Sequence, residues 1–526
     1  MKKIYCIIAT LLSVFPTVWG QQFDPQRKIR FAEQIIENYY VDTLDMNHVV
    51  EEGIIAMLKT LDPHSTYTNA AETKELTEPL AGNFSGIGIQ FNQLQDTIYV
   101  IQTIAGGPSE KCGIVAGDRI ISSNDTILSG VKMTQSDIRR HLRGPKNSVA
   151  NLKVLRKGVK DTLEFRVVRD DIPIYSVDAS YMADDNTGYI RVSRFAETTP
   201  KEVAEALQKL VKAGMTDLIL DLQDNGGGYL GAAYQLSELF LENGAPIVYT
   251  EGVRMPAKHY LSETDGPLRN IPVVVLVNQY SASASEILSG ALQDNDRGVI
   301  VGRRTFGKGL VQRPFPLPDG SMIRLTTMRY YTPSGRSIQK PYTSGDPDSY
   351  REDILDRFKS GELMNADSIQ FADSLLYHTL RLKRPVYGGG GIMPDRFVAL
   401  DTTQYTPYYR SLVAKGIMTR YADNYIVDRR KELKSEYKTE DRFIDHFEVT
   451  EPMMQGLVDF ATSEGVEFNE EEYQQSYNMI ATILKAIIGR DLFTQSTYFR
   501  VANSLNPIYV KGLETLNDGS YHKILK

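Results

Sequence analysis

An uninterrupted apolar run from Ile271 to Asn278 sets the first limit on how this chain folds. A strand without polar alternation is typical of a sheet buried on both faces. Strand-like and helix-like segments alternate around it, with strands expected at 188–195, 217–223 and 298–302 and helices at 199–213, 229–242 and 284–294. This alternation predicts an α/β core with a mostly parallel sheet.

Residues 82–170 differ from this core because glycines separate short β-type runs. The runs lie at 98–101, 119–121, 152–155 and 163–168, and one short helix fits Ser136 to Leu142. We therefore expect a small β-rich domain ahead of the α/β core.

Helical periodicity marks both ends of the chain. Ala32, Ile35, Ile36 and Tyr39 share one stripe, and residues 401–526 repeat the pattern. The polar stretch 341–385 indicates an insertion, with a helix expected around Ile369 to Leu382. The predicted divisions are a signal peptide (1–20), a helical N-terminal region (21–81), a β-rich domain (82–170), the core with its insertion (171–400) and a helical C-terminal region (401–526).

The first twenty residues have the pattern of a secretory signal. Two lysines precede the apolar stretch Ile4 to Val14, and the small residues Val18 and Gly20 fit a cleavage after Gly20. An uncleaved membrane anchor is the alternative, although the apolar run is short for a bilayer span. We expect an exported protein, periplasmic or otherwise extracytoplasmic, in which Cys112 is the one remaining cysteine and no intrachain disulfide forms.

Composition narrows the function classes. Apolar residues make up 42% and charged residues 24%, which is ordinary for globular proteins and excludes collagen, coiled coil and disorder. The net charge of −7 argues against an extended nucleic-acid surface. No histidine or cysteine cluster indicates a metal, and we expect no cofactor.

Ser283 follows the apolar strand and precedes a helix, in the run Ser281 to Ile287. One interpretation is a capping box, because Glu286 stands three residues later. The other is a nucleophile, because the free N–H groups and positive end of a helix N-terminus stabilise a developing oxyanion. Both interpretations remain open from the residues alone.

A nucleophilic serine needs a base. The seven histidines are sparse and no G-x-S-x-G elbow surrounds Ser283, so nothing indicates a histidine triad. Lys308 follows the next strand and should return to the same end of the sheet. To act as a base it must be neutral, which requires its pKa to fall by roughly three units through burial.

Gly302 to Gly309 also resembles a phosphate-binding loop, G-x-x-x-x-G-K. Gly309 stands where Ser or Thr should bind Mg²⁺, and Pro314 and Pro316 prevent the helix that such a loop needs. We therefore expect no nucleotide partner. The glycines after Asn225 leave backbone N–H groups bare, either as a flexible turn or as half of an oxyanion hole.

Eight motifs together resemble the carboxy-terminal processing peptidases, or tail-specific proteases, over residues 60–400. They are D-P-H-S-x-Y at 62–67, S-G-I-G-I at 85–89, G-G-P-S-E-K-C-G-I-V-A-G-D at 106–118, N-G-G-G at 225–228, S-A-S-A-S-E-I at 281–287, T-F-G-K-G-x-V-Q at 305–312, Y-T-P-S-G-R-S-I-Q at 331–339 and G-I-M-P-D at 391–395.

The resemblance implies a serine endopeptidase with a Ser-Lys dyad that works through an acyl-enzyme. Ser283 would be the nucleophile, Lys308 the general base and Gln312 the residue that orients the lysine, with Ser281 and Ser285 left to packing or capping. The N–H groups of Ala284 and of Gly227 or Gly228 would form the oxyanion hole. A straight strand separates residues four apart by roughly 13 Å, so Gln312 needs a bend to reach Lys308.

The segment from Gly82 to about Asp170 resembles a PDZ domain. This implies that the loop Gly86, Ile87, Gly88 and Ile89 captures the free carboxylate of a protein or peptide substrate, with the peptide added as a strand. A non-catalytic PDZ scaffold that only binds protein C-termini is the alternative. Gln223 stands where many members of the family carry Arg, which puts an ionic link at this position in doubt. By analogy with the family, the helical terminal regions would form a homodimer.

Overall fold

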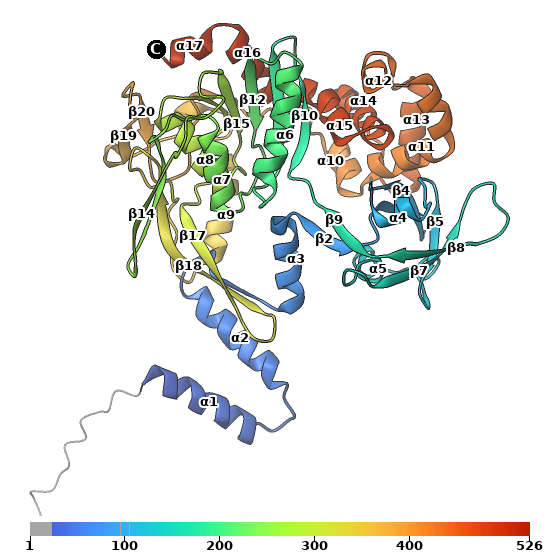
Figure 1. Cartoon of the computed structure of the whole chain (residues 1–526), viewed down its shortest axis with the longest axis horizontal. Helices are drawn as coiled ribbons and strands as arrows, with labels where there is room; N and C mark the ends of the chain where they lie inside the picture. The colour runs from blue at the N-terminus through green and yellow to red at the C-terminus, as the bar shows by residue number, and fades with distance from the viewer. Residues whose placement is uncertain (1–23, 95, 105) are drawn as a thin grey trace, which may run out of the picture.

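The computed structural model describes residues 24–94, 96–104 and 106–526. The expected signal peptide lies outside these residues. Figure 1 shows an α/β core, a small β-rich domain, a helical C-terminal region beside that domain, and amino-terminal helices at one end of the core. In the described part of the chain, no helix combines the length and apolarity that crossing a bilayer requires.

The central sheet of the core has six strands in the order β10-β11-β12-β15-β16-β21. They are β10 (Val177–Met182), β11 (Thr187–Val192), β12 (Asp217–Asp221), β15 (Val273–Val277), β16 (Val299–Gly302) and β21 (Arg396–Phe397). β10 pairs antiparallel with β11, and the other neighbours pair in parallel. All residues of β15 are buried, as its apolar sequence predicts.

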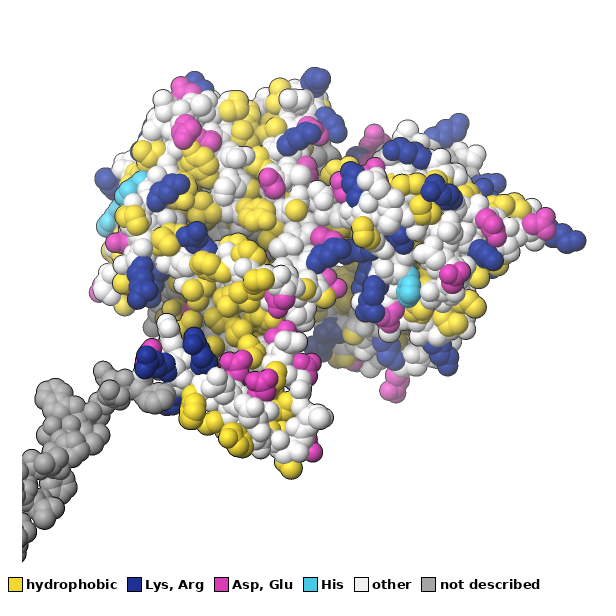
Figure 2. Space-filling view, turned by 60° about the horizontal axis from the view of Figure 1, so that its bottom comes forward, with side chains coloured by type: hydrophobic (Ala, Val, Ile, Leu, Met, Phe, Trp, Pro, Cys, Tyr) yellow, Lys and Arg dark blue, Asp and Glu magenta, His cyan; other side chains and the backbone are white. Residues whose placement is uncertain are grey.

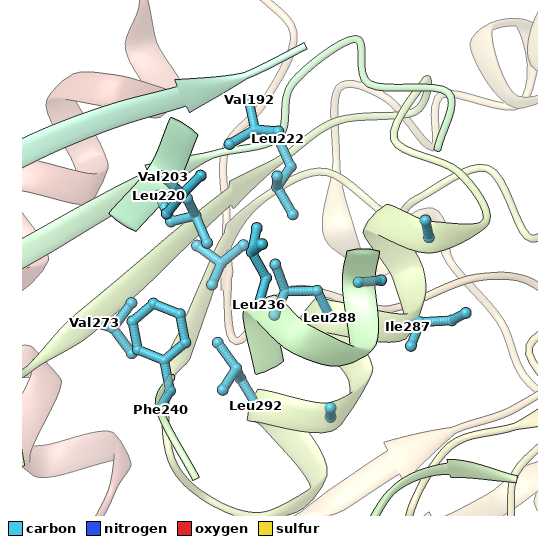
Figure 3. Packing of buried hydrophobic residues seen from close by; sticks show 14 of the residues in the cluster. Val192, Val203, Leu220, Leu222, Leu236, Phe240, Val273, Ile287, Leu288 and Leu292 are labelled. Carbon is cyan, nitrogen blue, oxygen red and sulfur yellow. The ribbon is translucent and has the colours of Figure 1, made fainter. Parts of the chain in front are cut away.

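Helices cover both faces of this sheet. One face packs against α6 (Thr199–Lys212), α7 (Leu230–Glu238) and α8 (Ala284–Asp294), and Figure 3 shows this packing from Val203, Leu236 and Leu288 toward Leu220 and Val273. The other face is covered by α16 (Pro507–Asn517) and α17 (Ser520–Ile524), the last helices of the chain. Every residue of α8 is buried, which fixes the element that begins at the candidate serine.

A second sheet of the core carries part of the site. Its path is β1-β18-β13-β14, with β17 paired to β18, and all described pairings are antiparallel. The strands are β1 (Thr66–Thr68), β13 (Pro246–Gly252), β14 (Met255–Leu261), β17 (Leu310–Pro316) and β18 (Met322–Tyr331). The α/β multidomain architecture is therefore confirmed, with one sheet rich in parallel pairs and one antiparallel sheet.

The β-rich domain has its own core and a two-stranded link to the rest. Its sheet runs β3-β4-β5-β7-β8 with β6 beside β5, and the link pairs β2 (Asn83–Gly86) with β9 (Asp170–Pro173). The elements are β3 (Ile89–Leu94), β4 (Thr97–Thr103), α4 (Pro108–Lys111), β5 (Arg119–Ser123), β6 (Thr126–Ile127), α5 (Gln135–Leu142), β7 (Val149–Leu155) and β8 (Leu163–Val168).

The terminal regions are helical, as predicted. The amino-terminal helices are α1 (Pro25–Tyr39), α2 (Met46–Lys59) and α3 (Ala70–Ala81), and α3 leads directly into β2. The C-terminal region buries its own cluster among α10 (Pro407–Ala414), α11 (Ile417–Glu436), α12 (Glu440–His446), α13 (Glu451–Ser463), α14 (Glu470–Leu492) and α15 (Gln495–Ala502), and a 3-10 turn, Asn503–Leu505, leads to α16. It touches the β-rich domain where the Asn92 amide donates to Asp423 Oδ2.

The helix expected around Ile369 to Leu382 is wrong. The insertion instead forms α9 (Pro347–Lys359), two 3-10 turns (Ala366–Ser368 and Asp373–Leu375) and a hairpin of β19 (Leu376–His378) and β20 (Pro385–Tyr387). α9 has the stronger start signal, because Asp346 caps it ahead of a proline at its first position. The later apolar residues are used by the hairpin and by the bond from Leu380 N–H to Asp294 O.

Candidate functional site

The candidate site lies at the carboxyl edge of the parallel strands. Ser283 follows β15 and precedes α8, glycines 226–228 follow β12, and Lys308 follows β16. Because parallel strands end at one edge of a sheet, segments far apart in the sequence meet there. The prediction that Lys308 returns to the same end as Ser283 therefore agrees with the topology.

These segments line one cavity of about 480 Å³. The lining also includes one side of α3 and the facing strands β17 and β18. The lining residues are Leu76, Thr77, Leu80, Gly226, Gly227, Gly228, Tyr229, Leu230, Ser283, Ala284, Ile287, Lys308, Leu310, Val311, Gln312, Pro314, Met322, Arg324 and Tyr330. Figure 2 shows hydrophobic side chains gathered over the middle of the core on the face turned toward the viewer.

Ser283 differs from the two serines beside it. Ser281 Oγ donates to Leu222 O at 2.7 Å and Ser285 Oγ donates to Asn225 O at 2.9 Å, so both are buried structural residues. Ser283 is half-buried, lines the cavity and has φ +58°. A side chain rarely adopts this backbone conformation unless the surroundings enforce it, and such strain is concentrated at functional sites.

Glu286 joins the Ser283 turn to the Lys308 loop. Its carboxylate accepts from the backbone N–H groups of Ser283 (2.8 Å), Gly307 (2.7 Å) and Lys308 (2.9 Å), and from the Thr305 hydroxyl (2.6 Å). Burial raises the pKa of Glu286 to about 7, although these hydrogen bonds favour the charged form. The sequence identified Glu286 as a capping residue, but its bonds to the second loop join segments some twenty positions apart and give no local signal.

Tyr330 makes a second connection between the same two segments. Its hydroxyl contacts Lys308 O at 2.5 Å and Ser283 O at 3.2 Å, and it can donate to either. Tyr330 is fully buried, and burial raises the pKa of its hydroxyl well above the usual value, so it stays protonated. The backbones that carry the serine and the lysine are thus held by one carboxylate and one phenol.

The Lys308 side chain is half-buried, and its amine has no carboxylate partner among the residues that the structure describes. Desolvation and, to a smaller extent, the nearby positive charge of Arg324 lower the pKa of Lys308 to about 8, while Glu286 and Asp62 oppose the shift. A lysine with this pKa is partly neutral near physiological pH, which is the state that a general base requires.

The glycine run approaches Ser283 closely. A Cβ on Gly227, whose φ is +99°, would lie 2.7 Å from Ser283 Cβ and 2.7 Å from Ala282 O. The Gly227 N–H donates to Asn225 Oδ1 at 2.8 Å and is therefore occupied. Of the three expected donors, Ala284 and Gly228 keep N–H groups with no hydrogen-bond partner within the described residues.

Gln312 lines the cavity, but its hydrogen bond runs to a different residue from the one expected. A bulge between Val311 and Gln312 supplies the bend that a straight strand lacks. The Gln312 amide donates to Thr326 Oγ1 at 3.1 Å, and Thr326 Oγ1 donates to Asp62 Oδ1 at 2.9 Å. The D-P-H-S motif of the amino-terminal region is thereby placed beside the site.

His64 of the same motif is not positioned as a base. Burial, together with the positive charge of Lys308, lowers the pKa of His64 to about 3, so the imidazole is neutral. Its Nε2 lies 3.0 Å from the hydroxyl of Tyr350 in α9. The insertion also supports the lysine loop directly, because Arg357 donates to Thr305 O and Arg304 O.

Two further predicted positions lie outside the cavity. Gln223 is buried and its Nε2 has no hydrogen-bond partner among the described residues, while Arg191 donates to its backbone carbonyl. The loop Gly86, Ile87, Gly88 and Ile89 enters β3, which is an edge strand of the β-rich domain. No group of three or more His, Cys, Asp or Glu side chains suited to a metal lies within the described ranges.

Comparison with known families matches three parts of the chain. Residues 186–349 match Peptidase family S41, residues 85–167 match the PDZ domain, and residues 408–494 match a family of unknown function. The first two matches coincide with the α/β core and the β-rich domain.

Known proteins extend this result. The carboxy-terminal-processing protease of Bartonella bacilliformis is 37% identical over 64% of this chain and 80% of its own length. The carboxy-terminal processing protease CtpB of Bacillus subtilis is 35% identical over 60% of this chain and 65% of its own length. The solved photosystem II D1 C-terminal processing protease is 29% identical, with a TM-score of 0.35, over 59% of this chain and 83% of its own. On the two bacterial relatives and the family matches, the chain belongs to the carboxy-terminal processing proteases, serine peptidases of family S41 that carry a PDZ domain.

Proposed function

We propose that this chain cleaves peptide bonds with a Ser-Lys dyad made of Ser283 and Lys308. One observation carries the proposal: a serine held at positive φ lines the same cavity as a half-buried lysine that has no carboxylate partner among the described residues. A merely structural serine needs no strained backbone, and a merely structural lysine would be exposed or paired.

The reaction follows from these two groups. Neutral Lys308 removes the hydroxyl proton as Ser283 Oγ attacks the peptide carbonyl, and a C–O bond forms. The lysine ammonium then gives the proton to the departing amine as the C–N bond breaks, which leaves an acyl-enzyme. Water attacks the ester, loses a proton to Lys308 and releases the acid, and the proton returns to Ser283.

The N–H groups of Ala284 and Gly228 supply the oxyanion hole in this proposal. Ala284 is the first residue of α8, where helix N–H groups lack intrahelical partners and the helix dipole is positive. The role proposed for Gln312 is to orient Lys308 through its Oε1, since Thr326 accepts from the amide nitrogen.

Substrate tails would be recognised by the PDZ domain. β3 is an edge strand, so a peptide has a free strand edge to pair with, and the loop Gly86 to Ile89 lies where that strand begins. From the predicted export signal, we propose that this activity lies outside the cytoplasm.

The direct test uses a peptide with an apolar free C-terminus and mass spectrometry of the products. Wild type should cleave it, and Ser283→Ala or Lys308→Ala should lower turnover by at least about 10³-fold, because each removes an essential part of one proton-transfer unit. Ser285→Ala is the matched control, since it removes a buried hydrogen bond of the same turn and should retain turnover. The amidated peptide should be cleaved more slowly.

Two results would contradict this proposal. Equal turnover by wild type and Ser283→Ala would assign the hydrolysis to another group. Tight binding of the peptide by a folded wild type without hydrolysis would support the non-catalytic PDZ scaffold instead.

The glycine run gives a second prediction. Gly227→Ala should lower turnover by at least about 10²-fold, because the new methyl group meets Ser283 and Ala282 and shifts the geometry of the oxyanion hole. Gly226→Ala is the control, because a Cβ at Gly226 meets nothing within 4 Å. Matching thermal melts must accompany the assay, and an active Gly227→Ala enzyme would refute the close approach as a catalytic requirement.

We also propose a homodimer in which α1 pairs with α1 of a second copy. No residue of α1 is buried, although the helix carries several large apolar side chains. Each of these side chains is at least 38% exposed: Ile29, Phe31, Ile35 and Ile36. In Figure 1, α1 and α2 extend away from the core. A second copy offers the same apolar stripe, which a two-fold axis brings together.

Light scattering after size-exclusion chromatography tests this dimer. Wild type should have twice the chain mass, and Ile29→Glu with Ile36→Glu should shift it to the monomer while the core stays folded. Arg27→Glu is the control for charge alone. A wild-type monomer at micromolar concentration would contradict the dimer.

A further inference from the structure

The cavity beside Ser283 is positively charged. Lys308 and Arg324 are the two lining residues with basic side chains, and the lining includes no Asp or Glu. Most other lining side chains are apolar, among them Leu76, Leu80 and Met322. A substrate segment held here therefore meets an apolar wall that contains a cationic point.

Arg324 is fixed by its strand. It lies in β18, opposite Pro314 of β17 on one side and Thr66 of β1 on the other. Residues on one face of paired strands line the cavity, and Gln312 and Met322 belong to this set. The guanidinium is therefore carried by the centre of a sheet and not by a mobile loop.

Arg324 differs from the other arginines in the interior of the core. Arg336 pairs with Asp294 at 2.7 Å, and Arg357 pairs with Glu362 at 2.7 Å. Arg324 is only partly exposed, yet its guanidinium has no hydrogen bond or ion pair with any residue in the described ranges. A desolvated guanidinium without an acidic partner leaves its donors available to a ligand.

The charge of Arg324 persists when the enzyme works. Lys308 must be neutral to act as a base, whereas a guanidinium stays protonated in proteins. Arg324 is also one of the groups that lower the pKa of Lys308. In the reactive state the cavity thus keeps one cation, with five N–H donors suited to a carboxylate.

We propose that Arg324 is a specificity-determining residue that binds a carboxylate of the substrate segment lying in the active-site cavity. The inference rests on the proposed peptidase function and names a substrate class for it: apolar peptides with an acidic side chain near the scissile bond. The shared chemistry is the carboxylate, and a free α-carboxylate close to the scissile bond is its second source.

Paired peptides test this inference. Each pair carries Glu or Gln at one position within four residues of the scissile bond, with the C-terminal tail unchanged. At one position, wild type should prefer Glu over Gln by at least about tenfold in kcat/KM, because a charge-assisted hydrogen bond replaces a neutral one. Arg324→Met should abolish the preference, Arg324→Lys should keep part of it, and Arg324→Glu should favour Lys at that position.

The matched control is Arg329→Met. Arg329 lies in the same strand β18, is exposed and is absent from the cavity lining, so its loss should leave the Glu/Gln ratio unchanged. A pH profile adds an independent readout. Since Arg324 lowers the pKa of Lys308, Arg324→Met should move the acidic limb of kcat/KM to higher pH, and Arg324→Lys should move it less.

The outcomes separate the two proposals. If wild type shows no hydrolysis that depends on Ser283, the proposed function is overturned. Hydrolysis with equal rates for Glu and Gln at every position, or a preference that survives Arg324→Met, overturns the role of Arg324 and leaves the peptidase intact. A further set of peptides tests the α-carboxylate as the source. These peptides end one to four residues after the scissile bond and carry either a free or an amidated C-terminus. If Arg324 favours only the peptides of this set that have a free C-terminus, the α-carboxylate is the source of the bound carboxylate.

Discussion

The buried carboxylate of Glu286 is the contact on which the site depends. It accepts hydrogen bonds from both the turn that presents Ser283 and the loop that presents Lys308. One acid thereby holds two backbones and uses its oxygens on N–H groups, which leaves the lysine amine without a paired carboxylate. The charge of Glu286 still favours the protonated amine, but desolvation of Lys308 outweighs it and lowers the pKa of the lysine.

Helix α3 connects the active-site cavity to the PDZ domain. α3 contributes Leu76, Thr77 and Leu80 to the cavity, and the chain passes from α3 directly into β2, the link to the PDZ domain. Arg143 of that domain donates to Glu78 of α3 at 2.8 Å. The wall of the cavity and the connection to the PDZ domain are therefore one continuous segment.

Local patterns predicted most of the fold. The apolar run of β15, the helix that begins after Ser283 and the glycine turns of the β-rich domain were identifiable because periodicity and capping are short-range. The helix expected around Ile369 to Leu382 failed because tertiary bonds, such as Leu380 N–H to Asp294 O, decide that segment. The family resemblance predicted that Ser283, Lys308 and the glycines share one site. It did not predict the hydrogen bond to Asn225 that occupies the Gly227 N–H. Asp62, Tyr330 and Arg324 reach the site only through strand pairing between distant segments, and no local pattern predicts their role.

The central claim is that the cavity keeps the amine of Lys308 partly neutral. NMR titration of lysine labelled with ¹³C at Cε, with the resonance assigned by its loss in Lys308→Arg, measures this directly in the full-length protein. The account predicts a midpoint at about 8. A midpoint at the ordinary lysine value of 10.5 would show that burial does not release the proton, and would contradict the proposed role of Lys308 as the base.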